Sequence, residues 1–147
     1  MDQTPTREEL LTRLDALWSH FSRKVAAEAG QEAESSGDEP LTGVQILTLR
    51  NLRRRGPMTM SALAETLGVS LSAANGLIIR LVEMGLVARE RDDADRRLVR
   101  VSLTDKGAER LKKGEMRRAR ILARYFSVLD SDELAQLVRL MEKIDHE

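Results

Sequence analysis

Residues 59–107, "TMSALAETLGVSLSAANGLIIRLVEMGLVARERDDADRRLVRVSLTDKG", decide the fold of this chain. Two short apolar segments follow one another there, and each begins with a hydroxyl side chain that can cap a helix, Thr59 and Ser70. Between them, Gly68 can adopt the left-handed backbone conformation that a tight turn needs. The pattern predicts a helix-turn-helix whose second helix, within residues 69–87, presents its outer face.

A β-hairpin is predicted directly after the second helix, over residues 86–103. "LVARERD" and "LVRVSL" are typical of two strands around a charged tip. In the second strand, Leu98, Arg100 and Ser102 point one way and Val99, Val101 and Leu103 the other, so one face packs on the domain and the other faces solvent. A helix-turn-helix followed by a hairpin is a winged helix. Arg96 and Arg97 stand at the hairpin tip, where folding does not require them, so we expect them to contact something outside the chain.

One amphipathic helix is predicted before this region, over residues 6–29. Its apolar residues recur at helical spacing: Leu10, Leu14, Leu17, Phe21 and Val25. Residues 30–40 are rich in Gly, Ser and acidic residues, so we expect a loop there.

The helix after this loop has a well-marked start and end. Thr42 and Gln45 fit a capping box, and Gly56 with Pro57 stops the helix. The residues expected to face inward are Val44, Leu47 and Leu52. The winged helix-turn-helix region therefore spans residues 41–104.

Two further helices are predicted within residues 105–147, the first of them capped by Thr104. The last helix carries one apolar stripe: Leu134, Leu137, Val138, Met141 and Ile144. Stripes at both chain ends favour a dimer interface formed by residues 6–29 and 105–147, and burial within one chain is the alternative. We expect a single domain over residues 1–147, mainly α-helical with a small β-hairpin wing.

Composition argues against several functional classes. The chain has no cysteine, which excludes disulfides and thiolate metal sites. Its two histidines, His20 and His146, lie far apart, so no metal is expected, and a site built from histidine and carboxylates is the alternative. No cofactor is expected. No P-loop, nucleophile elbow or dinucleotide fingerprint is found, so we expect no enzyme. A polar N-terminus and the lack of a membrane-length apolar run indicate a cytoplasmic protein without membrane contact.

The net charge of zero conceals an uneven distribution. Residues 50–110 hold 12 basic and 8 acidic side chains, a balance of +4, whereas residues 1–40 hold 4 basic and 9 acidic ones, a balance of −5. A locally basic segment is typical of an anion-binding face, although chance scatter of surface charge produces the same counts.

The segment from "LTGVQ" at residues 41–45 to "GLVARERDDADRRLVRVSLTDKG" at residues 85–107 resembles the MarR family of bacterial transcription regulators. The most specific part is D-x-D-R-R in the wing, followed by an alternating strand and L-T-x-x-G. The resemblance implies a homodimer joined through its N- and C-terminal helices. It also implies that the second helix of the helix-turn-helix enters the major groove and the wing approaches the minor groove. It further implies a repressor that a small-molecule ligand releases from double-stranded DNA, and an activator is the alternative.

The candidate DNA contacts lie on the second helix and the wing. Guanidinium groups suit phosphates and the minor groove, Asn75 can pair with adenine, and serine hydroxyls near the helix start can hold phosphates. The expected set is Ser70, Ser72, Ala73, Asn75, Gly76, Arg80, Arg91, Asp95, Arg96 and Arg97. The alternative for the wing cluster is a solvated hairpin with surface ion pairs.

Two of these residues raise separate expectations. DNA would repel Asp95, so we expect its carboxylate to pair with an arginine or to cap the tip turn. Gly76 costs about 1 kcal/mol against alanine in mid-helix, and many family members carry a polar or basic residue there. Gly76 allows either close approach of the helix to the bases or only weak sequence readout. For a two-fold dimer we expect a pseudo-palindromic operator with half-sites about 34–36 Å apart.

Three other interpretations stay open at this point. Trp18 and Phe21 are candidates for lining a pocket for an apolar or aromatic effector, and plain core residues are the alternative. Arg53, Arg54 and Arg55 either add contacts to the DNA backbone or form a solvated helix end. A winged-helix module that binds protein, without sequence-specific DNA binding, is the alternative function.

Overall fold

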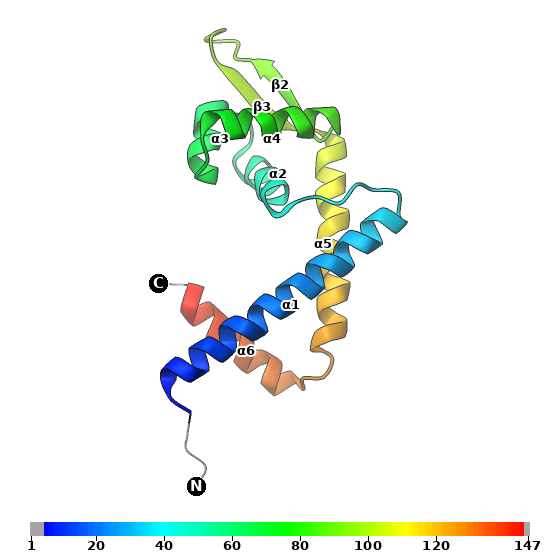
Figure 1. Cartoon of the computed structure of the whole chain (residues 1–147). Helices are drawn as coiled ribbons and strands as arrows, with labels where there is room; N and C mark the ends of the chain where they lie inside the picture. The colour runs from blue at the N-terminus through cyan, green and yellow to red at the C-terminus, as the bar shows by residue number, and fades with distance from the viewer. Residues whose placement is uncertain (1–4, 146–147) are drawn as a thin grey trace. The chain divides into compact units, whose positions relative to one another are not determined.

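The computed structural model describes residues 5–145. Its elements in chain order are α1 (Arg7–Ser35), α2 (Gly43–Arg55), β1 (Met58–Thr59), α3 (Met60–Leu67), α4 (Leu71–Glu83), β2 (Val87–Arg91), β3 (Val99–Leu103), α5 (Asp105–Phe126) and α6 (Ser131–Asp145) (Figure 1). The chain divides into two compact units. One consists of the segments Met1–Ser36 and Met116–Glu147, and the other of Gly37–Glu115.

The Gly37–Glu115 unit is a winged helix, as the sequence predicts. Its strands form an antiparallel sheet in the order β1-β3-β2, with Met58 opposite Val101 and Val87 opposite Leu103. Helix α3 packs on both α2 and α4, and each of the three helices contacts this sheet. Strand β1 was not predicted, because its two residues are too few to show an alternating pattern.

The helix-turn-helix has the predicted caps. The Thr59 hydroxyl accepts a hydrogen bond from the backbone N–H of Ala62 at 3.2 Å, and the Ser70 hydroxyl accepts one from Ala73 at 3.1 Å. Gly68 has φ 65°, in the left-handed region. These local bonds fix the start of each helix and the turn between them. The core beneath them consists of Leu49, Leu52, Met58, Met60, Leu63, Ala64, Ala74, Ile78, Leu81, Leu86, Val87, Val101 and Leu111.

The inward face of α2 differs from the prediction. Leu52 is buried as expected, but Val44 and Leu47 are 42% and 47% exposed, while Thr48 and Leu49 are fully buried. Polar residues can occupy this face because their hydrogen bonds are satisfied locally. The Thr48 hydroxyl, for example, donates to the Val44 carbonyl at 2.7 Å. The prediction from apolar residues alone was therefore wrong for Val44 and Leu47 and right for Leu52.

Helix α1 extends to Ser35, six residues beyond its predicted end at residue 29. The added turns contain Ala33, which is buried, and Glu32, which lies 3.6 Å from Arg120 on α5. The glycine-rich composition of residues 30–40 predicted an early stop. The helix ends instead near Gly37, whose φ of 79° is incompatible with a continuing helix.

The unit built from the chain ends has a small interior and long exposed stripes. Phe21 makes edge-on contacts with Tyr125 and Phe126, with ring centroids 5.6 and 5.5 Å apart. Trp18 is 54% exposed, so the core interpretation is wrong for this residue within a single chain. The apolar residues that stay exposed on α1 and α6 include Leu10, Leu14, Leu17, Leu134, Val138, Met141 and Ile144. Along its described length, α6 buries no residue.

No single helix within residues 5–145 is both long and apolar enough to cross a membrane. Helices α3 and α4 would meet that test of length and composition only together, and they are bent by 105° relative to each other.

Candidate nucleic-acid interface

Helix α4 has one buried face and one open face. Ala74, Ile78 and Leu81 are fully buried, whereas the side chains a half-turn away are exposed. The exposed residues of the opposite face are Ser72, Ala73, Gly76, Ile79 and Arg80, and Asn75 is half-buried beside them. Among the described residues, no side-chain hydrogen bond engages Ser72 or Asn75. Their polar groups are therefore available to an external partner.

The N-terminus of α4 is ordered by Ser70. Its hydroxyl is the helix cap, so the same group positions the first turn and lies next to backbone N–H groups that have no partner in the helix. Ser72 follows within that turn and is exposed. A helix start of this kind favours anions such as phosphate.

The wing tip, residues 92–98, is shaped by Asp92. One carboxylate oxygen accepts hydrogen bonds from the backbone N–H groups of Ala94 at 2.8 Å and Asp95 at 3.0 Å. The other oxygen pairs with Arg100 on β3. Arg100, and then the two N–H groups, hold the pKa of Asp92 below its usual range. Asp92 was not among the predicted site residues, although an aspartate at the start of a tight turn often caps the turn backbone.

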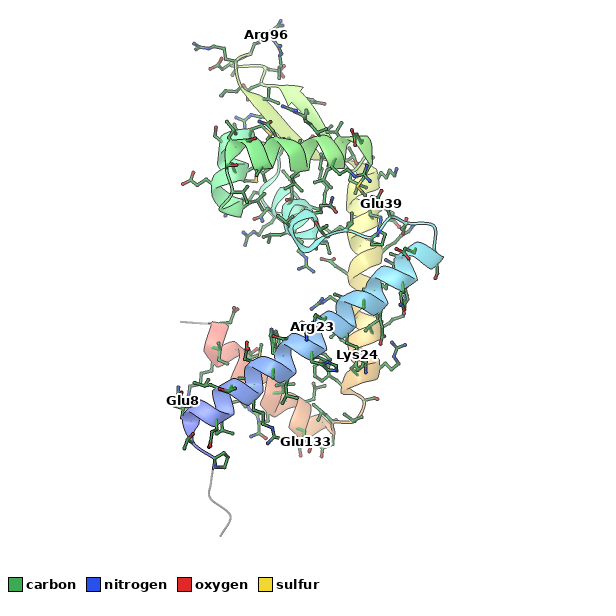
Figure 2. All side chains as sticks on the ribbon, viewed as in Figure 1. Glu8, Arg23, Lys24, Glu39, Arg96 and Glu133 are labelled. Atoms are coloured by element: carbon green, nitrogen blue, oxygen red, sulfur yellow. The ribbon has the colours of Figure 1, made fainter. Side chains whose placement is uncertain are left out.

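Asp95 fills both of the roles expected for it. Its Oδ1 accepts from the backbone N–H of Arg97 at 3.1 Å and from the Arg97 side-chain Nε at 3.2 Å. Arg97 is thereby tethered, although its side chain is 90% exposed. Arg96 projects from the hairpin tip in Figure 2. Within the described part of the chain, neither Arg96 nor Arg91 has an ion-pair or hydrogen-bond partner for its guanidinium.

Arg80 on α4 is already paired with carboxylates. Its guanidinium contacts Glu39, in the loop before α2, and lies 3.4 Å from Glu83 one turn along the helix. These pairs raise the pKa of Arg80, the hydrogen bond to Glu39 most of all. The pair with Glu39 could not be read from the sequence, because the two residues are 41 positions apart.

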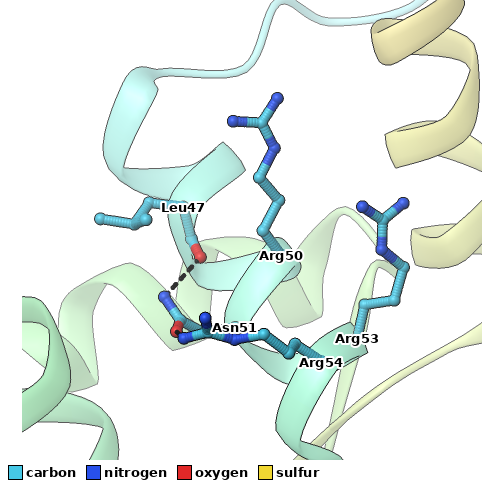
Figure 3. Close-up of a pocket in the computed structure, with 5 residues that line it drawn as sticks. All are labelled: Leu47, Arg50, Asn51, Arg53 and Arg54. Atoms are coloured by element: carbon cyan, nitrogen blue, oxygen red, sulfur yellow. Dashed lines mark hydrogen bonds between the residues drawn. The ribbon is translucent and has the colours of Figure 1, made fainter. Parts of the chain in front are cut away.

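An open hollow of about 560 Å³ on α2 is lined by Leu47, Arg50, Asn51, Arg53 and Arg54 (Figure 3). Arg53 donates two hydrogen bonds to Glu115 on α5, at 2.9 and 2.7 Å, and lowers the pKa of that carboxyl. Arg55 donates to Thr66 at 3.2 Å. Arg54 donates to the side-chain oxygen of Asn51 at 3.4 Å. Each of the three consecutive arginines is therefore held by a protein group. Whether they also contact a DNA backbone stays a prediction.

No cluster of three or more His, Asp or Glu side chains within residues 5–145 lies close enough to hold a metal ion. His146 lies outside the described residues. The arrangement supplies positive charge on a projecting hairpin and polar groups on a helix face, which suits the binding of an extended polyanion.

The chain matches known proteins over almost its whole length. A family model described as MarR family covers residues 41–99. The chain is 31% identical over 136 residues to YkoM of Bacillus subtilis, named as an uncharacterized HTH-type transcriptional regulator, covering 92% of this chain and 88% of that protein. It is 28% identical over 137 residues to the HTH-type transcriptional repressor MdtR of the same organism, covering 93% and 86%.

Solved structures agree with these sequence matches. The YusO protein of Bacillus subtilis is similar with a TM-score of 0.77 and 27% identity, covering 97% of this chain and 99% of that one. RV1404 from Mycobacterium tuberculosis is similar with a TM-score of 0.78 and 26% identity, covering 97% and 95%.

Proposed function

Because this chain belongs to the MarR family of transcriptional regulators, we propose that it binds double-stranded DNA sequence-specifically as a homodimer. The wing tip carries this proposal. Asp92 and Asp95 shape the turn, while Arg96 projects with no partner among the described residues. An unpaired guanidinium on an ordered hairpin is suited to the phosphates and minor groove beside a docked helix.

The contacts divide by element. On α4, Asn75 reads a base edge, Arg80 and the serines contact phosphates, and the small side chains at positions 73 and 76 let the helix approach. On the wing, Arg91, Arg96 and Arg97 reach the backbone or the minor groove, and Asp95 positions Arg97. The proposed set is Ser70, Ser72, Ala73, Asn75, Gly76, Arg80, Arg91, Asp95, Arg96 and Arg97.

The exposed stripes of α1 and α6 support a dimer. Leu14 and Leu17 on α1 are 56% and 59% exposed, and Ile144 on α6 is 68% exposed. Contiguous apolar surface of this kind is unusual on a monomer. The proposed interface residues are Leu10, Leu14, Leu17, Leu134, Leu137, Val138, Met141 and Ile144. A two-fold dimer would bind a pseudo-palindromic operator.

Three finer parts of the proposal rest on the family. The relative MdtR is named a repressor, so we assign the same sign of regulation to this chain. A small-molecule effector would relieve repression, with Trp18 and Phe21 near its site. A regulator that acts on chromosomal DNA would work in the cytoplasm, and no catalytic role is assigned.

The first test measures DNA binding by fluorescence anisotropy, with duplexes from upstream of the protein's own gene and from a random-sequence selection. Arg96→Ala with Arg97→Ala should weaken binding, and should flatten the plot of log affinity against log salt by about 0.9 per lost phosphate contact. A melting temperature of the double variant equal to that of the wild type would show that the two substitutions leave the fold intact. Equal affinity and salt slope for both proteins would contradict the proposed role of the wing.

A protein-binding winged helix is the second candidate, and exposed apolar side chains near the reading face favour it. Leu71 and Ile79 on α4 are 51% and 50% exposed, and Leu98 on the wing is 42% exposed. Failure of the selection to enrich any duplex, together with a salt-insensitive association with a protein partner, would favour this candidate.

A further inference from the structure

An acidic loop lies against the DNA-reading helix in the Gly37–Glu115 unit. The Glu39 carboxylate of that loop pairs with the guanidinium of Arg80 on α4, and both side chains are about half exposed, at 54% and 48%. Glu83 adds a weaker contact at 3.4 Å. The strongest partner of the only basic side chain on α4 is thus a residue outside the helix-turn-helix.

The position of Glu39 is set by a buried arginine. Arg110 on α5 has a side chain only 9% exposed, donates a hydrogen bond to the Glu39 carbonyl, and lies 3.7 Å from the Asp38 carboxylate. Pro40 follows and restricts the backbone further. The backbone of Glu39 is therefore held in place beside Arg80, so pairing of the two side chains costs less conformational entropy than it would from a free loop.

The Arg80 guanidinium cannot bind the Glu39 carboxylate and a DNA phosphate equally well at the same time. The residue lies on the exposed side of α4, between the buried positions Ile78 and Leu81, where a docked helix would flank the DNA backbone. The carboxylate and a phosphate carry the same sign of charge and would both accept hydrogen bonds from one guanidinium group. Binding DNA through Arg80 thus requires Glu39 to release it or to be drawn close to a phosphate.

We propose that Glu39 competes with a DNA phosphate for the Arg80 guanidinium, so that the loop at residues 37–39 limits the affinity of this chain for DNA. The inference rests on the proposed docking of α4 on DNA, and it adds an intramolecular competitor to that docking. An exposed ion pair of this kind corresponds to a change in affinity of roughly two- to fivefold.

The test compares Glu39→Gln with matched controls in the full-length protein. Glu109→Gln removes one negative charge from the same unit at an exposed position of α5. Arg80→Ala, alone and combined with Glu39→Gln, shows whether the effect passes through Arg80. Anisotropy is recorded over a salt series with a selected duplex and with an unrelated duplex, and melting temperatures are recorded for every variant.

The proposal expects Glu39→Gln to bind both duplexes about two- to fivefold more tightly, with a salt slope steeper by up to about 0.9. It expects this gain to disappear in the Arg80→Ala background and to exceed the gain from Glu109→Gln. A gain that persists without Arg80 would show general charge repulsion and would overturn the proposal. A loss of affinity in Glu39→Gln would overturn it as well, because Glu39 would then hold Arg80 ready for DNA.

The same data separate this inference from the proposed function. A wild-type protein that binds both duplexes equally contradicts sequence-specific regulation, yet the Arg80-dependent gain still supports the competition. A protein that binds neither duplex in any variant at low salt contradicts both.

Discussion

At the scale of single residues, carboxylates rather than arginines determine the shape of the wing. Asp92 holds two backbone N–H groups and Arg100, and Asp95 holds the backbone and side chain of Arg97. Neither aspartate is placed to attract DNA. Their contribution is to orient the neighbouring guanidinium groups, which explains how an acidic residue can belong to the proposed DNA-binding tip.

The pKa of Asp92 gives a prediction with a defined sign. Because the folded state lowers this pKa, the ionised carboxylate contributes stability above the unfolded value of about 3.9, and that contribution is lost as the pH falls through the folded value. An NMR titration of the Asp92 carboxyl should show its midpoint below the ordinary range. Arg100→Ala should move the midpoint upward, because Arg100 is the largest cause of the shift. An unchanged midpoint in that variant would contradict the assigned cause.

At the scale of elements, the start of α5 depends on a close approach of two backbones. A Cβ built at Gly107 would lie 2.0 Å from the Leu86 carbonyl oxygen, which cannot move without disturbing β2. The Thr104 hydroxyl secures the same junction, since it donates to the Gly85 carbonyl at 2.7 Å and accepts from the Gly107 N–H at 3.0 Å. The L-T-x-x-G motif therefore has a structural cause in this chain.

Two glycines of α5 should respond in opposite ways to alanine. Gly107→Ala should destabilise the protein by about 1–3 kcal/mol or more, through overpacking against backbone. Gly114→Ala in the same helix, where a Cβ meets nothing within 4 Å, should stabilise it by roughly 0.5–1 kcal/mol. Chemical denaturation of both variants measures the difference. Equal stability of the two variants would contradict the close approach at Gly107.

Replacing Gly76 on α4 by alanine should have opposite effects on the stability of the protein and on its affinity for DNA. A Cβ there meets nothing within 4 Å, so Gly76→Ala should raise the stability by about 0.5–1 kcal/mol. If the bare backbone lets the helix approach the bases, the same variant should bind its selected duplex less tightly. Denaturation and anisotropy on one preparation test both halves. Unchanged affinity would instead indicate that this position makes no close contact with DNA.

Most helices and strands could be predicted from local sequence signals. The ion pairs between residues far apart in the sequence could not be predicted. The caps at Thr42, Thr59 and Ser70 depend on neighbours within three residues, so the sequence alone locates these helix starts. The partners Glu39 and Glu115 lie 41 and 62 positions from Arg80 and Arg53 and become visible only once the chain is folded.

The inward face of α2 could not be predicted from apolarity for a related reason. Thr48 is buried with its hydroxyl satisfied inside its own helix, while Val44 remains exposed. Hydrogen-bond satisfaction depends on backbone geometry, which a count of apolar residues does not contain. The candidate DNA contacts were predictable as exposed positions on α4 and the wing, but not the partner that Arg80 already has.

At the scale of the whole molecule, the exposed stripes predict that the chain assembles. Leu14→Glu with Leu17→Glu would place charges in the proposed apolar interface, so we expect a monomer in sedimentation velocity at micromolar concentration. Binding to a pseudo-palindromic duplex should weaken as well, because the two half-sites would no longer be bound by linked subunits. Val128→Glu is the matched control, since this apolar residue is 82% exposed and lies outside both helices. A double variant that stays dimeric would place the interface elsewhere.

The exposed indole on α1 has a practical consequence. Trp18 is the single tryptophan of the chain, and its neighbours Leu14 and Leu17 belong to the proposed interface. An indole that passes from water into an apolar contact emits at shorter wavelength. Association of two subunits would therefore shift the emission maximum of the intrinsic tryptophan fluorescence. Subunit exchange could then be followed in real time without attaching a dye.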